Sequence, residues 1–133
     1  MKTLAMMREV KAVFIELPPF ERHRNEYLDD DSFLTLQQLL MHSPEAGDVI
    51  PGAGGLRKLR FADERRGKGK RGGLRVIYYW WSGKSQFWLF TLYNKDEMSD
   101  LTKGQRELLK EMIKRELAAR RRDEEIGKTH TEK

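Results

Sequence analysis

Two long runs of β-branched and aromatic residues most limit the folds that this chain can adopt. They are residues 74–81 (LRVIYYWW) and residues 86–93 (QFWLFTLY), and only four residues separate them. Val, Ile, Tyr, Phe and Trp favour β-strands, and so short a connection joins antiparallel neighbours. The two runs therefore predict a β-hairpin.

A third strand is expected just before this hairpin. Residues 56–62 (LRKLRFA) alternate in polarity, which puts Leu59 and Phe61 on one face and Lys58 and Arg60 on the other. Three strands in a row predict an antiparallel meander. Its second face would carry cations, which is unusual for a strand.

Helices are expected before and after the meander. A strand at residues 11–16 ends at two prolines, and Pro18 and Pro19 suit a helix start. A second helix, capped by Asp30 or Asp31, ends before Pro44, and a Thr-x-x-Gln capping box at residues 102–105 starts a third, which runs to about Arg121. The order β-α-α-β-β-β-α predicts an α+β fold: a small antiparallel sheet with two N-terminal helices and one C-terminal helix.

Length and composition favour one domain. A chain of 133 residues suits a single unit, with an ordered core over residues 11–121 and flexible tails at 1–8 and 123–133. Because there is no cysteine, disulfides and thiolate metal sites are excluded. The longest apolar run, residues 76–81, is far shorter than the roughly 20 residues that span a bilayer, so a cytoplasmic protein without membrane contact is expected.

Positive charge is concentrated in one segment. The chain has 26 Lys and Arg against 21 Asp and Glu, for a net charge of +5, but residues 55–75 hold nine cations and two carboxylates, a net of +7. The nine are Arg57, Lys58, Arg60, Arg65, Arg66, Lys68, Lys70, Arg71 and Arg75. A polyanion is the expected partner of this segment.

The available side chains restrict the chemistry. His23, His42 and His130 are far apart in sequence, so neither a metal site nor a catalytic histidine pair is expected. The glycine-rich residues 67–73 lack the spacing of a phosphate-binding loop, and no cofactor is expected. Lys, Arg and Tyr remain, and they suffice for RNA cleavage through the 2′-hydroxyl, which needs a base, an acid and a cation for the phosphate. A merely solvated basic loop and nucleic-acid binding without catalysis are the alternatives.

Five motifs in order carry a resemblance to a known family. They are Gly47-Asp48-Val49-Ile50-Pro51-Gly52, Gly54-Gly55-Leu56-Arg57-Lys58-Leu59-Arg60, Gly67-Lys68-Gly69-Lys70-Arg71-Gly72-Gly73, Arg75-Val76-Ile77-Tyr78-Tyr79, and Leu92-Tyr93-Asn94-Lys95-Asp96-Glu97 followed by Asp100-Leu101-Thr102. Over residues 11–117 the chain closely resembles HigB-type toxins of the RelE/ParE superfamily. The resemblance implies a bacterial type II toxin that cuts mRNA in the ribosomal A site and is held inactive by a cognate antitoxin, a helix-turn-helix protein of the HigA type.

The resemblance also implies site residues. Lys58 and Arg60 match the cation pair of the second strand, Arg75 the arginine that opens the third, and Lys95 the lysine that ends the fourth. Asp96 and Thr102 stand where RelE has an arginine and a tyrosine, so Tyr93 is the candidate phenol and Lys68 or Lys70 the candidate base. The expected RNA or ribosome contacts are Arg57, Arg65, Arg66 and Arg71. Lys58 and Arg75 are expected on a solvent-facing rim.

Two other functions are compatible with this family and charge pattern. One is a ParE-like toxin that inhibits DNA gyrase without cleaving anything. The other is a non-catalytic module that binds RNA or the ribosome. The cations Lys58 and Arg60 on the open strand face favour the ribonuclease.

Overall fold

The computed structural model describes residues 11–62 and 73–131, with side chains described up to Ile126. The chain divides into two compact units. The first spans Met1–Ile50 and Gly55–Asp100, and the second spans Pro51–Gly54 and Leu101–Lys133.

The described elements confirm the α+β class, with two helices before the meander and one after it. The first unit contains β1 (Val13–Glu16), α2 (Pro18–Tyr27), α3 (Asp30–His42), β2 (Asp48–Val49), β3 (Arg57–Phe61), β4 (Leu74–Trp81), the short 3-10 turn Ser82–Lys84 and β5 (Gln86–Asn94); the second contains α4 (Lys103–Thr131). Among the described residues, no helix combines the length and the apolar character needed to cross a bilayer.

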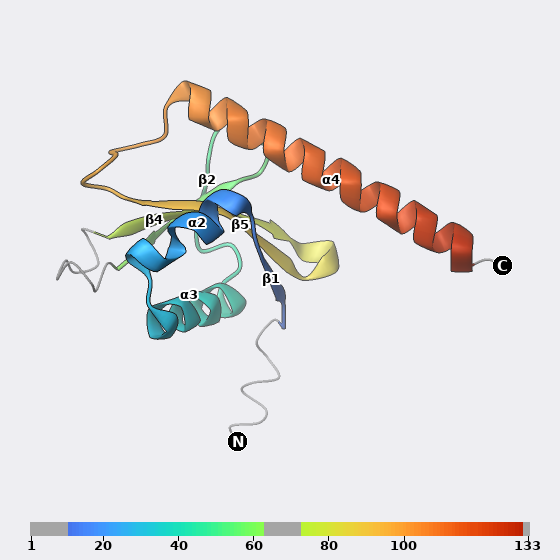
Figure 1. The fold of residues 1–133 in the computed structure, drawn as a ribbon, viewed down its shortest axis with the longest axis horizontal. Coiled ribbons are helices and arrows are strands. Elements are labelled where there is room, and N and C mark those ends of the chain that lie inside the picture. Colours follow the sequence, from blue (N-terminus) through green and yellow to red (C-terminus); the bar gives the residue numbers. More distant parts are fainter. Residues whose placement is uncertain (1–10, 63–72, 132–133) are drawn as a thin grey trace, which may run out of the picture. The chain divides into compact units, whose positions relative to one another are not determined.

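The sheet has five strands in the order β1-β5-β4-β3-β2 (Figure 1). Strands β2 to β5 pair antiparallel, as the meander predicts, whereas β1 pairs parallel with β5. The sheet is therefore mixed rather than purely antiparallel. Two helices and the strands β2 to β4 separate β1 from β5, and so long a connection allows the chain to return beside β1 in the same direction.

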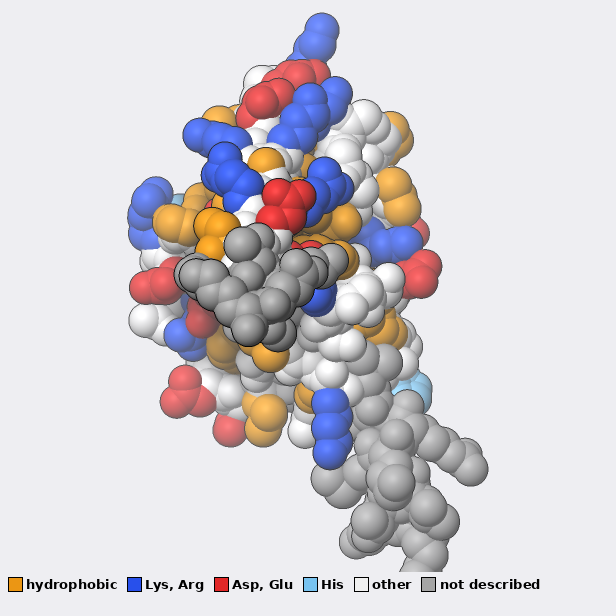
Figure 2. Space-filling view, turned by 90° about the vertical axis from the view of Figure 1, so that its right-hand side faces the viewer, with side chains coloured by type: hydrophobic (Ala, Val, Ile, Leu, Met, Phe, Trp, Pro, Cys, Tyr) orange, Lys and Arg blue, Asp and Glu red, His pale blue; other side chains and the backbone are white. Residues whose placement is uncertain are grey.

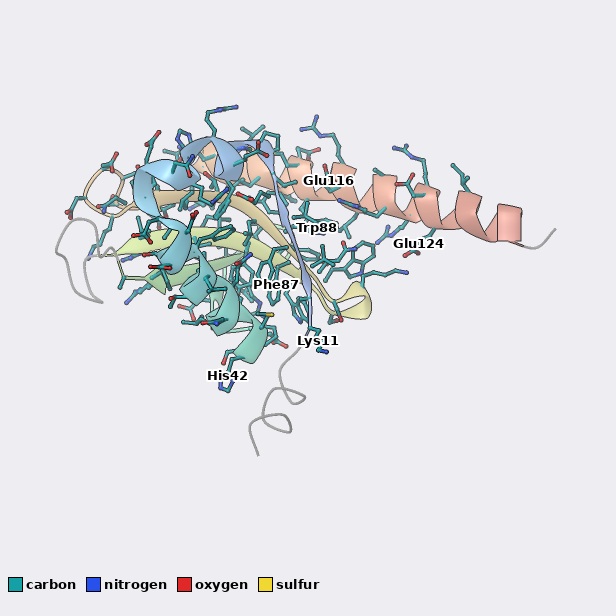
Figure 3. All side chains as sticks on the ribbon, turned by 60° about the horizontal axis from the view of Figure 1, so that its bottom comes forward. Lys11, His42, Phe87, Trp88, Glu116 and Glu124 are labelled. Carbon is teal, nitrogen blue, oxygen red and sulfur yellow. The ribbon has the colours of Figure 1, made fainter. Side chains whose placement is uncertain are left out.

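A β-bulge lies on β5. Ile77 pairs with Thr91 and the next residue of β4, Tyr78, pairs with Leu89, so Phe90 has no partner of its own. Such an additional residue bends and twists the strand that contains it. Next to the bulge, the consecutive residues Phe87 and Trp88 point to opposite faces of the sheet (Figure 3).

One face of the sheet is packed against α2 and α3 (Figure 1). The apolar core there contains residues from both helices and from β3, β4 and β5: Phe20, Tyr27, Leu28, Leu36, Leu40, Leu59, Phe61, Leu74, Val76, Tyr78, Phe87, Leu89 and Leu92. The alternation predicted for β3 is confirmed, because Leu59 and Phe61 belong to this core. Lys58 and Arg60 belong to the opposite face, since side chains alternate along a strand.

Two of the three helices begin with the residues that the sequence predicts. Helix α2 begins with prolines at its first two positions. In the box before α4, Gln105 N–H donates to Thr102 Oγ1 at 3.1 Å and Thr102 N–H donates to Gln105 Oε1 at 2.8 Å. The cap of α3, however, is Asp29 rather than Asp30 or Asp31: its backbone is extended and its carboxylate accepts from Ser32 N–H at 2.8 Å.

Helix α4 is longer than expected. It continues to Thr131 instead of ending near Arg121. Residues 116–126 are mostly Arg, Glu and Ala, which favour helix, and no proline interrupts them. Glu116 and Arg120 are one helical turn apart and form an ion pair at 3.8 Å. Side-chain pairs of this kind stabilise a helix without an apolar stripe. The apolar periodicity therefore predicted an end of α4 that is too early.

Candidate anion-binding site

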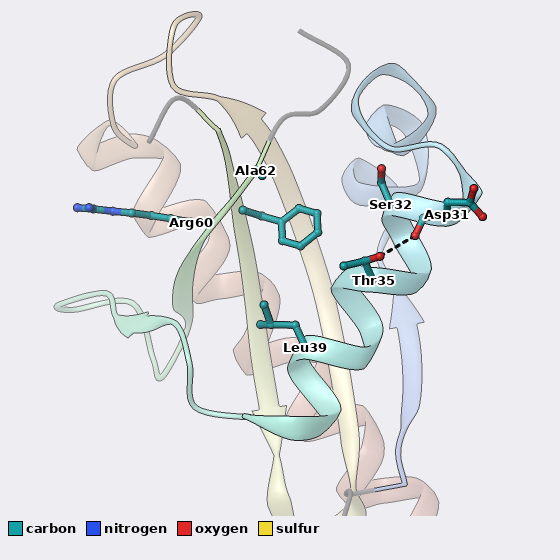
Figure 4. A pocket seen from close by; sticks show the side chains of 7 residues that line it. Asp31, Ser32, Thr35, Leu39, Arg60 and Ala62 are labelled. Carbon is teal, nitrogen blue, oxygen red and sulfur yellow. Dashed lines mark hydrogen bonds between the residues drawn. The ribbon is translucent and has the colours of Figure 1, made fainter. Parts of the chain in front are cut away.

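The central feature of the candidate site is a row of three side chains across three neighbouring strands. Arg60 of β3 pairs with Arg75 of β4, and Arg75 pairs with Tyr93 of β5. Residues that pair directly share one face of a sheet, so these three, called the cross-strand row below, lie side by side on the face opposite the core. Figure 4 shows the Arg60 side chain extending away from helix α3. Lys58, two residues before Arg60, belongs to the same face.

The two arginines of the cross-strand row are placed unfavourably unless an anion joins them. Like charges directly opposite each other on a sheet are destabilising. Arg75 is moreover buried, with 6% of its surface exposed. Among the described residues no carboxylate lies within 4.0 Å of its guanidinium, which donates to the Leu74 carbonyl oxygen at 3.4 Å. The expectation that Arg75 lies on a solvent-facing rim was wrong, because the residue is buried in the central strand β4.

Tyr93 supplies a protonated phenol to the row. It is 6% exposed, and its hydroxyl oxygen is buried without a hydrogen-bond partner among the described residues. Burial raises the pKa of Tyr93, the Asp100 carboxylate raises that pKa further, and the Arg75 charge lowers it. The phenol is therefore neutral at physiological pH and is a proton donor. An unsatisfied buried hydroxyl costs stability, which is typical of a group that has a functional partner.

Asp100 completes the cluster and was not among the residues proposed from the sequence. Its Oδ1 lies 3.4 Å from Lys58 Nζ, in a pair with 30% of the Lys58 and 59% of the Asp100 side chain exposed. Its negative charge also raises the pKa of Tyr93. The only signal in the sequence was its position in the fifth motif, seven residues after the end of the fourth predicted strand.

Lys95 lies at the edge of this group. It is exposed and follows the last residue of β5, and its N–H donates to the Gly73 carbonyl oxygen at 3.4 Å. Gly73 directly precedes β4, whose second residue is Arg75. The structure thus brings together five residues predicted as catalytic: Lys58, Arg60, Arg75, Tyr93 and Lys95.

Arg57, predicted to bind RNA or the ribosome, instead binds a loop of its own chain. Its guanidinium donates to Gly47 O at 2.8 Å, to Glu45 O at 3.3 Å and to the Glu45 carboxylate at 3.1 Å. Tyr78 holds the same loop, since its hydroxyl donates to Pro44 O at 2.8 Å and accepts from Gly47 N–H at 3.0 Å. Arg57 pairs with Tyr78 and so shares the core face, away from the cross-strand row.

The remaining predicted residues, Lys68, Lys70, Arg65, Arg66 and Arg71, lie outside the described residues. On the face of the molecule in Figure 2, basic and acidic side chains are interspersed. A hollow of about 610 Å³ lies between α3 and the end of β3, lined by Asp31, Ser32, Thr35, Leu39, Arg60, Phe61 and Ala62 (Figure 4). The hollow shares Arg60 with the cross-strand row, although the Arg60 side chain extends away from α3.

Neither a metal centre nor a known family defines the site further. Within the described part of the chain, no three His, Asp or Glu side chains are grouped as potential metal ligands. No protein-family model matches the sequence. The geometry places two opposed guanidinium groups, a lysine and a neutral phenol on one sheet face, an arrangement that suits an anion.

Tyr93→Phe is expected to raise the free energy of unfolding by about 1 kcal/mol, because it removes a buried hydroxyl that has no partner among the described residues. Urea denaturation followed by circular dichroism measures the change. The matched control is Tyr78→Phe, which breaks two hydrogen bonds and should lower the same free energy by about 1 to 2 kcal/mol. A Tyr93→Phe variant as destabilised as the control would contradict the description of this hydroxyl.

Proposed function

We propose that this protein is the toxin of a bacterial type II toxin–antitoxin system, a metal-independent endoribonuclease of the HigB type that cuts mRNA on the ribosome. The observation that carries the proposal is the cross-strand row Arg60–Arg75–Tyr93, with Lys58 on the same face. Two guanidinium groups side by side suit a phosphodiester, because each forms charge-assisted hydrogen bonds with phosphate oxygens. The five motifs that resemble HigB-type toxins support the same assignment.

In the proposed reaction the 2′-oxygen of the RNA attacks the adjacent phosphorus and the bond to the 5′-oxygen breaks. Arg60 and Arg75 stabilise the negative charge that develops on the phosphate oxygens. The neutral phenol of Tyr93 gives its proton to the leaving 5′-oxygen, and a lysine accepts the proton of the 2′-hydroxyl. The products are a 2′,3′-cyclic phosphate and a 5′-hydroxyl, and Tyr93 then regains its proton from solvent.

The base in this scheme is one of four lysines. Lys58 and Lys95 border the cross-strand row, and Lys68 and Lys70 lie outside the described residues. A lysine is a weak base at neutral pH because it is mostly protonated. Much of the rate must therefore come from alignment of the 2′-hydroxyl with the scissile phosphate, which the ribosome supplies by holding the mRNA.

The proposed partners follow from charge and from the family resemblance. The segment of net charge +7 suits ribosomal RNA, and binding should weaken steeply as salt rises. A cognate antitoxin, a helix-turn-helix protein of the HigA type, would hold the toxin inactive in the bacterial cytoplasm. A toxin that acts on ribosomes needs neither a cofactor nor a membrane.

Cleavage of one labelled mRNA is expected only in the presence of a programmed 70S ribosome at matched salt. Lys58→Ala should lower this cleavage by about 100-fold, because it removes a cation or base from the site. The matched control is Lys84→Ala, which removes the same charge in the turn between β4 and β5, at the far end of β4 from Arg75, and should cut like the wild type.

The outcomes separate the possible functions. Equal cleavage with and without ribosomes would show a free-standing ribonuclease. Salt-sensitive ribosome binding without cleavage would show a non-catalytic binding module. Inhibition of DNA supercoiling by gyrase with intact mRNA would show a ParE-like toxin. Each of these three results overturns the proposal.

A further inference from the structure

Strand β3 has an open outer edge over its second half. Its neighbour β2 is two residues long and pairs with Arg57 and Lys58, whereas β3 continues to Phe61. Within residues 11–62 and 73–131, no strand lies beside Arg60 or Phe61 on that side. The open edge of a strand presents backbone N–H and C=O groups with which another chain can pair.

The backbone groups of Arg60 point toward this open edge. Ile50 N–H donates to the Leu56 carbonyl oxygen at 2.9 Å, so the backbone groups of Leu56 face the side of β2. Backbone groups alternate between the two edges of a strand, so those of Lys58 and Arg60 face the same side as those of Leu56. On that side Lys58 pairs with Asp48 of β2, while Arg60 lies past the end of β2.

The hollow described above lies at this edge, between the end of β3 and α3 (Figure 4). Its volume is about 610 Å³, and Leu39, Phe61 and Ala62 give it an apolar lining. Arg60 lines it as well, although the Arg60 side chain extends away from α3, which indicates that the backbone of Arg60 forms part of the wall. A strand edge beside a hollow suits an extended peptide, because main-chain hydrogen bonds add the peptide to the sheet and alternate side chains enter the hollow.

The side chains around this edge specify the chemistry of such a peptide. A residue directly opposite Arg60 would share its face of the sheet, and the residues on either side would point toward α3. Arg60 is exposed and shares its face with Lys58, so Asp or Glu complements it there, because opposite charges in directly paired positions attract. The two neighbouring residues would meet the apolar lining of the hollow. The complementary segment therefore has the pattern apolar–acidic–apolar.

We propose that the open edge of β3 and the hollow bind an extended apolar–acidic–apolar segment of a partner protein, whose carboxylate pairs with Arg60 and thereby blocks the anion site. Such a partner is an inhibitor. Its identity as the antitoxin, and the identity of the blocked reaction as mRNA cleavage, rest on the function proposed above. The segment pairs with only a few residues of β3, so it binds weakly by itself and belongs to a larger interface.

The probe for this site is the peptide acetyl-Ser-Thr-Val-Glu-Val-Thr-Ser-amide, added at millimolar concentration to the full-length protein. Amide hydrogen exchange followed by NMR should slow at least about tenfold at Arg60, because the added strand accepts a hydrogen bond from its N–H group. Two control peptides test the two parts of the recognition. One is N-methylated at the glutamate and so lacks a main-chain donor, and the other has lysine in place of the glutamate. Each should bind at least about tenfold more weakly.

A pair of variants in α3 tests the hollow. Thr35 is exposed and lines the hollow, so Thr35→Trp fills it and should weaken binding of the peptide at least about tenfold. The matched control is Leu34→Trp, which places the same indole on the same helix at an exposed position that does not line the hollow. This control should bind the peptide like the wild type. Circular dichroism checks that both variants are folded.

Unchanged exchange at Arg60, or equal binding of the N-methylated peptide, would overturn the addition of a strand. Protection of Arg60 that rises with protein concentration without peptide would show that a second copy of the chain occupies the edge, which also overturns the proposal. Cleavage on ribosomes is measured separately, and saturating peptide should inhibit it. Full cleavage at saturating peptide would refute the inhibitory role. A wild-type protein that does not cleave would refute the proposed function, but exchange at Arg60 would still decide whether the edge binds the peptide.

Discussion

Replacing Arg75 by methionine is expected to abolish mRNA cleavage, by at least about 100-fold, while raising the free energy of unfolding by about 1 kcal/mol. Methionine has a similar length and no charge. Arg75 is buried directly opposite Arg60, and no carboxylate among the described residues compensates it. Loss of the guanidinium therefore removes an uncompensated buried charge, which stabilises the fold. It also removes a cation that the reaction needs at the phosphate, which stops cleavage. Urea denaturation and cleavage on programmed ribosomes measure the two effects.

Arg57→Met is the matched control for this variant. It removes the same charge from the neighbouring strand β3, but there the guanidinium makes three hydrogen bonds to residues 45 and 47. The control should lose stability by about 1 to 3 kcal/mol and retain cleavage. If Arg75→Met were the less stable of the two, Arg75 would be a structural residue and the case for an anion site would fail.

Gly73→Ala is expected to lower the free energy of unfolding by about 3 kcal/mol. A Cβ atom at Gly73 would overlap the Phe61 carbonyl oxygen and lie 2.8 Å from the carbonyl carbon. Both obstacles belong to the backbone, so β3 and β4 must move apart where their pairing begins. Because Arg75 is two residues away, cleavage should fall as well. Thermal denaturation measures the loss of stability.

The control for this substitution is Gly83→Ala in the turn between β4 and β5. There the nearest atom to a new Cβ is Trp81 Nε1, at an ordinary contact distance of 3.7 Å. The variant should stay within about 0.5 kcal/mol of the wild type. Equal effects at Gly73 and Gly83 would show that the strands adjust more freely than their pairing indicates.

The local features of the fold could be predicted because each depends on residues close together in sequence. The alternation in β3 indicates its core face through Leu59 and Phe61, and the capping box at Thr102 and Gln105 marks the start of α4. The parallel pairing of β1 with β5 could not be predicted in the same way, since no short pattern encodes which distant strand becomes a neighbour. The choice of Asp29 over Asp30 as the cap of α3 depends on the backbone, which three consecutive aspartates leave open.

The candidate site was predictable in its residue types but not in its arrangement. The cations of β3 and β4 were visible in the motifs, whereas their register, which sets Arg60 beside Arg75 and Arg75 beside Tyr93, is a property of the assembled sheet. Burial of Arg75 contradicts the ordinary preference of arginine for the surface, and sequence reasoning follows that preference. Asp100 was missed as a site residue because its contact with Lys58 and its effect on the pKa of Tyr93 arise only in the folded chain.

The bulge at Phe90 has a consequence for parity along β5. Trp88 and Tyr93 are five positions apart, an odd interval that in an unbroken strand would direct the two side chains to opposite sides. The additional residue reverses this parity, so Trp88, which pairs with Tyr79, and Tyr93, which pairs with Arg75, share one side. Deleting Phe90 would leave Trp88 and Tyr93 four positions apart in a regular strand, so the bulge would be lost while both side chains stayed on the same side. The bulge therefore absorbs the additional residue, so that Trp88 and Tyr93 both stay on the side of the sheet opposite the core.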